Sequence, residues 1–314
     1  MNEKEIKHLK PIDFDEMWSK WIAEVKNIPN KVYMNQIEKK DFGSIKTFFF
    51  DSVNNTKVFA RLYYNETSVN LKRPLIVFYH GFGGSSADEY YVKKTMYWVR
   101  KGFSVLMMDC RNQGGQTFDT NNYCFMDKNY YCRGLLDKDK VYDKLLYQDA
   151  LKLLEISRDK SLEPFEDLYD KEIIVVGPSQ GGQISLAVAA LSDIPELCIP
   201  DIPSGCAIIS RIEGRYGKYT PYDDIIKENP QYKDLIYNNI SYTDIINMAS
   251  KITCPVFSSV GTVDNICPME YYLFAYDMIK TQKEVLFYEG YGHGGFDKYH
   301  FPKKLEFVFK NIDK

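Results

Sequence analysis

Short, continuously apolar runs alternate with longer amphipathic stretches along most of the chain. The stretches predict helices at 88–101, 141–157, 180–192, 268–280 and near 302–312. The runs between them read PLIVFYH, FSVLMMD, EIIVVGPS, CAIIS, CPVFSSVG and EVLFYE. Strands that are apolar at every position are buried on both faces, as in a parallel sheet covered by helices. This alternation predicts an α/β fold with a mostly parallel, doubly wound sheet.

The first part of the chain follows a different pattern. Residues 13–26 predict an amphipathic helix that begins at an Asp cap and carries an apolar stripe of Phe14, Trp18, Trp21 and Val25. The runs IKTFFFDS and KVFARLYYN predict antiparallel leading strands joined at Asn54–Asn55, because asparagine tolerates the positive φ of a tight turn. We expect one domain over 1–314, with 1–40 as an N-terminal helical extension and 114–140 as an insertion.

Composition and charge narrow the class of protein. The 314 residues are 45% hydrophobic and 15% aromatic, which is enough for a large core and excludes a disordered chain. Lys and Arg number 40 against 43 Asp and Glu, whereas a protein that binds nucleic acid is normally basic. No run of roughly 18 apolar residues predicts a membrane span. The charged start MNEKEIKHLK lacks the apolar stretch of a secretory signal, so we expect a cytoplasmic protein.

The seven cysteines indicate neither a metal site nor a disulfide framework. Their number is odd, and no CxxC pair occurs. Several lie in apolar runs, where a free cysteine behaves as a small buried hydrophobe. No cluster of His, Cys and Asp has the spacing of metal ligands. We therefore expect reduced thiols and no metal or cofactor.

The clearest chemical signal is the sequence Gly177-Pro178-Ser179-Gln180-Gly181. It follows the apolar run IIVV and precedes a helix of small residues, which is the strand–turn–helix context of a GxSxG nucleophile elbow. Gly177 and Gly181 would let the strand and the helix approach closely around a strained turn. The turn raises the hydroxyl of Ser179 above the sheet and directs the helix N-terminus at a developing oxyanion. We predict Ser179 as a nucleophile.

A serine nucleophile needs a base, and the chain has four histidines: His8, His80, His293 and His300. In this type of fold the chain order is serine, acid, histidine, which excludes His8 and His80. His293 lies in the glycine-rich sequence YEGYGHGG, directly after the run EVLFYE. His300 is expected to be a capping or surface residue at the start of the last helix. We therefore predict His293 as the base.

Asp264 is the predicted acidic partner, because it follows the run CPVFSSVG. Such a partner fixes the tautomer of the histidine and stabilises the imidazolium. Three other aspartates also lie between Ser179 and His293 in the chain, but none directly follows an apolar run. We expect turn or capping roles for these three, Asp201, Asp223 and Asp224.

The oxyanion hole is predicted to combine the backbone N–H groups of Gln180 and Phe82. Phe82 lies in the sequence HGFGG, directly after the run PLIVFY. This loop lacks the GxGxxG spacing and the Walker lysine of a phosphate-binding loop. His80 is expected to pack and form hydrogen bonds beneath it. After the next run, Asp109 and Arg111 are expected to form a local ion-pair network.

These motifs together resemble carbohydrate esterase family seven, the acetyl xylan esterase and cephalosporin C deacetylase group of α/β-hydrolases. The resemblance covers nearly the whole length and includes HGFGG, DCRNQGG, GPSQGGQISLAVAAL, VGTVDNICP and YEGYGHGG. It implies an α/β-hydrolase fold with a triad of Ser179, Asp264 and His293. It also implies oxyanion donors at Phe82 and Gln180, the positions that the residues themselves indicate.

The resemblance further implies a serine esterase that removes acetyl groups from short acetylated xylo-oligosaccharides and from cephalosporin-type esters. Members of the family are cytoplasmic and form a hexameric ring, in which the segment equivalent to 114–140 takes part in subunit contacts. Several aromatic residues of this segment would be costly to leave in water, which favours an interface over a mobile surface insertion. They are Tyr123, Phe125, Tyr130 and Tyr131.

Three positions depart from the family pattern. Asn112 and Pro178 replace glycines, and Gly294 replaces a glutamate. None of these changes removes a predicted triad member, so an esterase remains the expectation and its substrate preference stays open. Another acyl hydrolase, such as a peptidase, and a catalytically silent binding protein are the alternatives.

Overall fold

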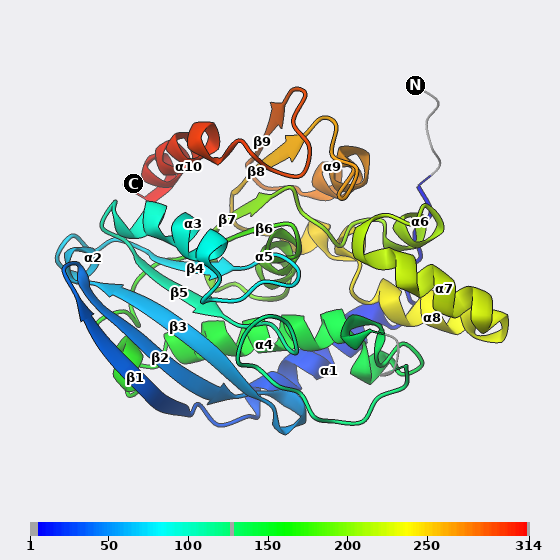
Figure 1. Cartoon of the computed structure of the whole chain (residues 1–314), viewed down its shortest axis with the longest axis horizontal. Helices are drawn as coiled ribbons and strands as arrows, with labels where there is room; N and C mark the ends of the chain where they lie inside the picture. The colour runs from blue at the N-terminus through cyan, green and yellow to red at the C-terminus, as the bar shows by residue number, and fades with distance from the viewer. Residues whose placement is uncertain (1–5, 126–128, 313–314) are drawn as a thin grey trace.

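A single mixed sheet runs through the computed structural model, which describes residues 6–125 and 129–312 (Figure 1). Within those residues the sheet has nine strands in the order β1-β2-β3-β5-β4-β6-β7-β8-β9. The strands are β1 (Val32–Lys40), β2 (Gly43–Asp51), β3 (Lys57–Asn65), β4 (Leu75–Tyr79), β5 (Ser104–Met108), β6 (Ile173–Pro178), β7 (Pro195–Asp201), β8 (Val256–Gly261) and β9 (Lys283–Tyr288).

Pairing in the sheet follows the prediction from the apolar runs. The strands from β5 through β4 and β6 to β9 are all parallel to their neighbours. β1, β2 and β3 are antiparallel, and β3 joins β5 in the antiparallel sense. The turn between β2 and β3 contains Asn54 and Asn55, both with positive φ (57° and 54°). A mostly parallel sheet with antiparallel leading strands is therefore confirmed.

Helices cover both faces of the sheet (Figure 1). On one face, α1, α4 and α5 share a large apolar core with alternate residues of the strands, and on the other α3 and α10 cover a smaller one. Alternation is clear in β4, where Val77 contributes to the first core and Ile76 to the second. The helices are α1 (Phe14–Lys26), α2 (Glu66–Asn70), α3 (Glu89–Val99), α4 (Tyr142–Ser157), α5 (Gln180–Leu191), α6 (Ile208–Glu213), α7 (Thr220–Glu228), α8 (Lys233–Ser241), α9 (Met269–Met278) and α10 (Asp297–Ile312).

Three local predictions were wrong. The run CAIIS does not form a strand but leads into α6, because Ala207 adopts a left-handed φ of 54° and Asp244 accepts the N–H groups of Ala207 and Ile208. The strand lies earlier, at β7. Part of the predicted helical extension is β1, an edge strand whose residues are mostly exposed and polar. The last helix, predicted near 302–312, is present but begins earlier, at Asp297, and includes Pro302.

The insertion predicted at 114–140 packs largely against its own chain. Tyr123 and Tyr131 are buried, and the ring of Tyr131 contacts that of Phe82 edge to face. Residues 126–128 of this segment, like 1–5 and 313–314, lie outside the described residues. Contacts within one subunit therefore already remove these two rings from water, so their burial needs no second subunit.

Parallel strands end at the same edge of the sheet, and this edge gathers the predicted site. The loops after β4, β6, β8 and β9 carry Phe82, Ser179, Asp264 and His293, respectively. In open α/β sheets ligands bind outside the carboxyl ends of the strands. Of the helices in the described part of the chain, none is long and apolar enough to cross a bilayer.

Candidate active site

Ser179 lies at a sharp turn between β6 and α5. Its backbone is strained, with φ 56° and ψ −116°. The Ser179 N–H donates to the carbonyl oxygen of Asp201 (2.9 Å) at the end of β7, and this bond anchors the turn. A Cβ atom at Gly181 would lie 2.0 Å from the carbonyl oxygen of Tyr79, and one at Gly177 would lie 2.6 Å from it. Both glycines are therefore required for the close approach of the strand and the helix.

Asp264 and His293 form a hydrogen bond across two strand-end loops. The distance from His293 Nδ1 to Asp264 Oδ2 is 2.7 Å, and the Asp264 side chain is almost fully buried. The other carboxylate oxygen, Oδ1, accepts the N–H groups of Ile266 (2.8 Å) and Cys267 (2.9 Å). Both oxygens of the carboxylate are thus occupied, which holds it in place and orients the imidazole through Nδ1.

The protonation of His293 depends on its neighbours. Burial alone would lower its pKa, but hydrogen bonds to Asp264 and Cys267 raise the pKa of His293 from 6.5 to about 9. A carboxylate beside an imidazole favours the charged form of the ring. The site is therefore built to stabilise an imidazolium.

A cavity of about 250 Å³ brings the predicted residues together. Its lining includes Ser179, Gln180, Phe82 and His293. Among the hydrogen bonds of the described residues, none joins Ser179 to His293, and Ser179 Oγ lies 4.0 Å from Cys267 Sγ. Catalytic hydrogen bonds are often long without substrate and tighten when it binds.

The two loops that carry Phe82 and Gln180 are tied together by a residue to which the sequence assigned no role. Gln113 Oε1 accepts the N–H of Gly83 (2.7 Å), and Gln113 Nε2 donates to Gln180 Oε1 (3.0 Å) and to the hydroxyl of Tyr142 (3.0 Å). Gln113 therefore fixes the distance between the two predicted oxyanion donors. The only sign of this role in the sequence was the place of Gln113 in DCRNQGG, one of the sequences that carry the family resemblance.

His80 lies beneath the loop that carries Phe82, as expected. The side chain is fully buried, Nε2 accepts the N–H of Cys110 (3.0 Å), and Nδ1 lies 2.8 Å from the carbonyl oxygen of Gly81. Burial lowers the pKa of His80, which favours the neutral ring. This pattern is consistent with a packing and hydrogen-bonding residue.

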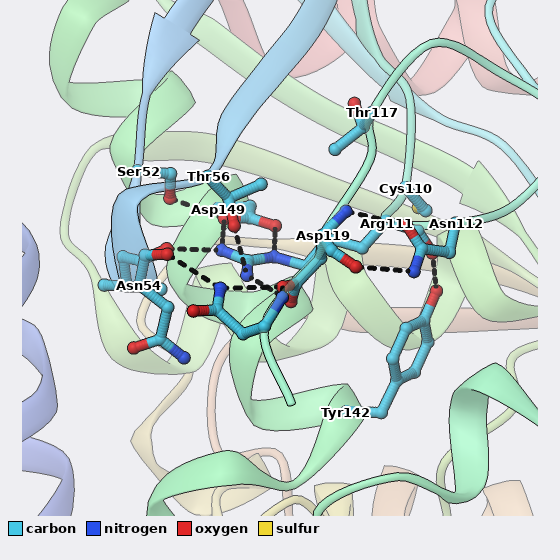
Figure 2. A network of polar contacts seen from close by, with 12 residues as sticks. Ser52, Asn54, Thr56, Cys110, Arg111, Asn112, Thr117, Asp119, Tyr142 and Asp149 are labelled. Carbon is cyan, nitrogen blue, oxygen red and sulfur yellow. Dashed lines mark hydrogen bonds and ion pairs between the residues drawn. The ribbon is translucent and has the colours of Figure 1, made fainter. Parts of the chain in front are cut away.

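Arg111 forms a buried network, but with partners other than the expected Asp109 (Figure 2). Its guanidinium makes a bidentate pair with Asp149 (2.6 and 2.7 Å) and a further ion pair with Asp119 (2.9 Å). Asp109 instead accepts the N–H groups of Ser86 (2.6 Å) and Gln116 (2.8 Å). The predicted pair between Asp109 and Arg111 was wrong. Asp109 bonds to backbone N–H groups instead, and Arg111 bonds to carboxylates of α4 and of the segment 114–140.

All three departures from the family pattern have a structural explanation. Asn112 has a φ of 52°, which asparagine tolerates. Its side chain bonds twice to the backbone of Asp119, at 2.7 and 3.0 Å (Figure 2). Gly294 has a φ of 114°, so a glutamate at this position would be strained. Pro178 lies beyond the last β4–β6 pair, where the ladder with β4 does not need its N–H.

His300 and Asp201 form a second buried His–Asp pair, which corrects the surface and turn roles expected for them. His300 Nε2 lies 2.8 Å from Asp201 Oδ1, and Nδ1 lies 2.9 Å from the hydroxyl of Tyr288. Lys304 of α10 pairs with the other oxygen of Asp201. Asp201 is the last residue of β7. We did not predict this strand, because two prolines interrupt its apolar run. Asp223 and Asp224 lie in α7 and pair with Arg215.

Two further residues of the cavity were not predicted. Arg211 of α6 is buried and donates to the carbonyl oxygen of Ile266 (2.7 Å) and to Cys267 Sγ (3.4 Å). Cys267 follows Asp264 in the same loop, but nothing in the sequence connects that loop to α6. Among the described residues, no group of three His, Cys, Asp or Glu side chains is placed to hold a metal ion.

A family model for acetyl xylan esterase, AXE1, matches residues 2–311. The chain belongs to the acetyl xylan esterase family. Two solved structures are similar over 98% of this chain and 96% of theirs. They are the acetyl xylan esterase from Paenibacillus sp. R4 (26% identity, TM-score 0.86) and acetyl xylan esterase 1 from Thermoanaerobacterium sp. JW/SL YS485 (25% identity, TM-score 0.84). The α/β-hydrolase fold is thereby confirmed.

A curated relative is similar at the sequence level. The acetyl esterase Axe7A of Xylanibacter ruminicola is 24% identical over 282 residues, which cover 88% of this chain. The chain spans 62% of the length of that relative.

Proposed function

We propose that this acetyl xylan esterase family member is a serine carboxylesterase that removes acetyl groups from small O-acetylated sugars, such as acetylated xylo-oligosaccharides. The observation that carries the proposal is the 2.7 Å bond between His293 and Asp264 at the same cavity as Ser179. The family membership and the names of the similar proteins support acetyl esters as the substrate class.

In the proposed mechanism, Ser179 Oγ attacks the acetyl carbonyl while His293 Nε2 takes the hydroxyl proton. The negative charge that develops on the carbonyl oxygen is stabilised by the N–H groups of Phe82 and Gln180 and by the N-terminus of α5. Asp264 stabilises the imidazolium that forms. His293 then donates its proton to the departing sugar oxygen and leaves Ser179 acetylated.

The second half of the reaction repeats these roles. A water molecule enters the cavity, His293 takes its proton, and the resulting hydroxide attacks the acetyl-enzyme. The same two N–H groups hold the second oxyanion, and acetate leaves as Ser179 regains its proton. No metal or cofactor takes part in either half.

Acetate release from a substrate panel tests the proposal. The panel contains acetylated xylo-oligosaccharides of increasing length, simple acetyl esters, cephalosporin C and a chromogenic dipeptide. We expect the highest kcat/KM for short acetylated sugars and hydrolysis of cephalosporin C at a lower rate. Turnover of the dipeptide without release of acetate from any ester would contradict the proposal and favour a peptidase.

We infer further that the protein is a cytoplasmic homo-oligomer, with a hexamer as the assembly that the family resemblance implies. Phe118, in the segment 114–140, supports a subunit contact, because 68% of this large apolar residue is exposed in the single chain. Light scattering after size-exclusion chromatography measures the mass in solution. A monomer at micromolar concentration would contradict the inference.

A further inference from the structure

Arg211 is a buried cation without a carboxylate partner. Only 2% of the residue is exposed, and Nε has no hydrogen-bond partner. The guanidinium donates to neutral oxygens of Ser204 and Ile266, and to Cys267 Sγ. Among the described residues, no carboxylate lies within ion-pair distance of it. The guanidinium also lies over the ring of Tyr219, 4.8 Å from its centroid, but neither this ring nor the neutral oxygens balance a buried charge, so an anion next to Arg211 is expected.

Cys267 is the ionisable group in contact with this guanidinium, with Sγ 3.4 Å from Nη2. Burial alone would raise the pKa of the thiol, and Asp264 also raises it. Arg211, followed by His293, outweighs them and lowers the pKa of Cys267 to about 7. For the other buried cysteines of the described residues, burial outweighs any nearby cation and raises the pKa of each, including Cys206, on which Arg211 acts without a hydrogen bond to the sulfur. They are Cys110, Cys132, Cys198, Cys206 and Cys254.

The charged groups around the cavity of Cys267 come from four segments. α6 supplies Arg211, the loop after β8 supplies Asp264, and the loop after β9 supplies His293. The segment before α7 supplies Lys218, whose charge is already paired with Asp143 of α4. Asp244 is the carboxylate that acts on Arg211 from further away, and its oxygens already accept the N–H groups at the start of α6. Arg211 therefore donates directly to the sulfur, and the imidazole of His293 acts on it as well.

The sulfur also faces the place where substrate would bind. Cys267 lines the same cavity as Ser179 and His293, and its Sγ lies 4.0 Å from Ser179 Oγ. A small molecule that reaches the hydroxyl of Ser179 therefore also reaches this thiol. The cavity, the unpaired arginine and the short distance to the serine are three separate observations that concern one atom.

We propose that Arg211 holds Cys267 as a thiolate and that this thiolate is a modification site for soft electrophiles and hydrogen peroxide. With peroxide, the thiolate attacks one oxygen, the S–O bond forms and the O–O bond breaks. Sulfur is oxidised by two electrons to a sulfenic acid. The departing hydroxide takes a proton from the imidazolium of His293 and becomes water.

Modification changes the site, and this consequence rests on the proposed esterase function. An added oxygen or alkyl group at Cys267 occupies the cavity beside the hydroxyl of Ser179. It also removes the negative charge that helps to hold the imidazolium. Hydrolysis of acetyl esters therefore stops when Cys267 is modified, and a thiol reductant restores it after mild oxidation because sulfenic acid is reducible.

Alkylation of the folded protein with iodoacetamide, followed by peptide mass spectrometry, tests the proposal without any measurement of hydrolysis. Between pH 5 and 9 we expect carbamidomethylation of Cys267 with a midpoint near 7. At pH 7, Arg211→Met is expected to slow labelling at least about fivefold, because a rise of one pKa unit lowers the thiolate fraction from about one half to about one tenth. Arg211→Lys keeps a cation and retains most of the rate. Arg215→Met, a change at an exposed arginine outside the cavity, leaves the rate unchanged.

A midpoint near that of a free cysteine, about 8.5, would overturn the proposal, as would equal rates in wild type and Arg211→Met. The pH profile of the wild type alone decides if Arg211→Met does not fold, which circular dichroism reveals. Hydrolysis of 4-nitrophenyl acetate before and after peroxide then separates the two proposals. Labelling at Cys267 in a protein that hydrolyses no acetyl ester refutes only the esterase. Hydrolysis without labelling of Cys267 refutes only the thiolate.

Discussion

Three residues lie near the imidazole ring of His293 and affect how it binds a proton. Asp264 holds Nδ1, and Cys267 and Ser179 face the same cavity as the ring. Sequence order predicted that Ser179, Asp264 and His293 lie at one edge of the sheet, because each follows a strand of the parallel sheet. The contact of Cys267 with Arg211 could not be predicted, because it depends on how α6 packs against the loop after β8.

The pH profile of hydrolysis follows from the raised pKa of His293. The ring must be neutral to accept the proton of Ser179, and with a pKa of about 9 it is mostly protonated at pH 7. We therefore expect kcat/KM for acetyl esters to rise about tenfold per pH unit up to a plateau above about pH 9.

Cys267→Ala removes a group that raises this pKa, and the midpoint of the profile is expected to shift to lower pH. Initial rates with 4-nitrophenyl acetate, corrected for its spontaneous hydrolysis, measure both profiles. A plateau that the wild type already reaches at pH 7 would show that the imidazolium is not stabilised in this way.

Single elements are positioned by buried polar groups as well as by apolar packing. Arg111 joins the loop after β5 to α4 through Asp149, and to the β2–β3 turn through Thr56 and the carbonyl oxygen of Val53 (Figure 2). Apolar patterning predicted β5, α4 and the turn, but the choice among the acidic partners of Arg111 depends on the three-dimensional approach of segments. Likewise, β7 was missed because Pro195 and Pro200 interrupt its apolar pattern.

Loss of the Arg111 network is expected to destabilise the whole chain. Arg111→Met leaves Asp149 and Asp119 buried without a cation, which costs about 3–5 kcal/mol of unfolding free energy. Urea unfolding followed by circular dichroism measures this change. Arg215→Met is the matched control, because Arg215 pairs with Asp223 and Asp224 at the surface. Equal unfolding midpoints for both variants would contradict the role of the network.

Over the whole molecule, α10 is attached to the end of β7 by one buried group of charges. Asp201 of β7 accepts from His300 and Lys304 of α10 and from Ser259 of β8, and its backbone carbonyl oxygen holds the N–H of Ser179. Asp201 therefore links the last helix to the turn that carries Ser179. The sequence predicted the helix but not this link, because nothing in a linear pattern pairs residues 201 and 300.

This group of charges makes stability depend on pH. Burial lowers the pKa of His300, so the unfolded chain binds a proton more readily than the folded one, and stability falls as the pH drops below about 6.5. His300→Gln is expected to weaken this dependence between pH 7 and pH 5. Thermal unfolding at pH 5, 6 and 7 measures the effect. The same loss of stability in both proteins would assign the dependence to other groups.

We propose above all that Ser179 is the nucleophile of an acetyl esterase. The rate of 4-nitrophenyl acetate hydrolysis tests this role of Ser179 most directly. Wild type and Ser179→Ala are compared at pH 9, with folding checked by circular dichroism. We predict that kcat falls at least about 10³-fold in Ser179→Ala, because the acetyl-enzyme cannot form. Comparable rates in the two proteins would contradict it.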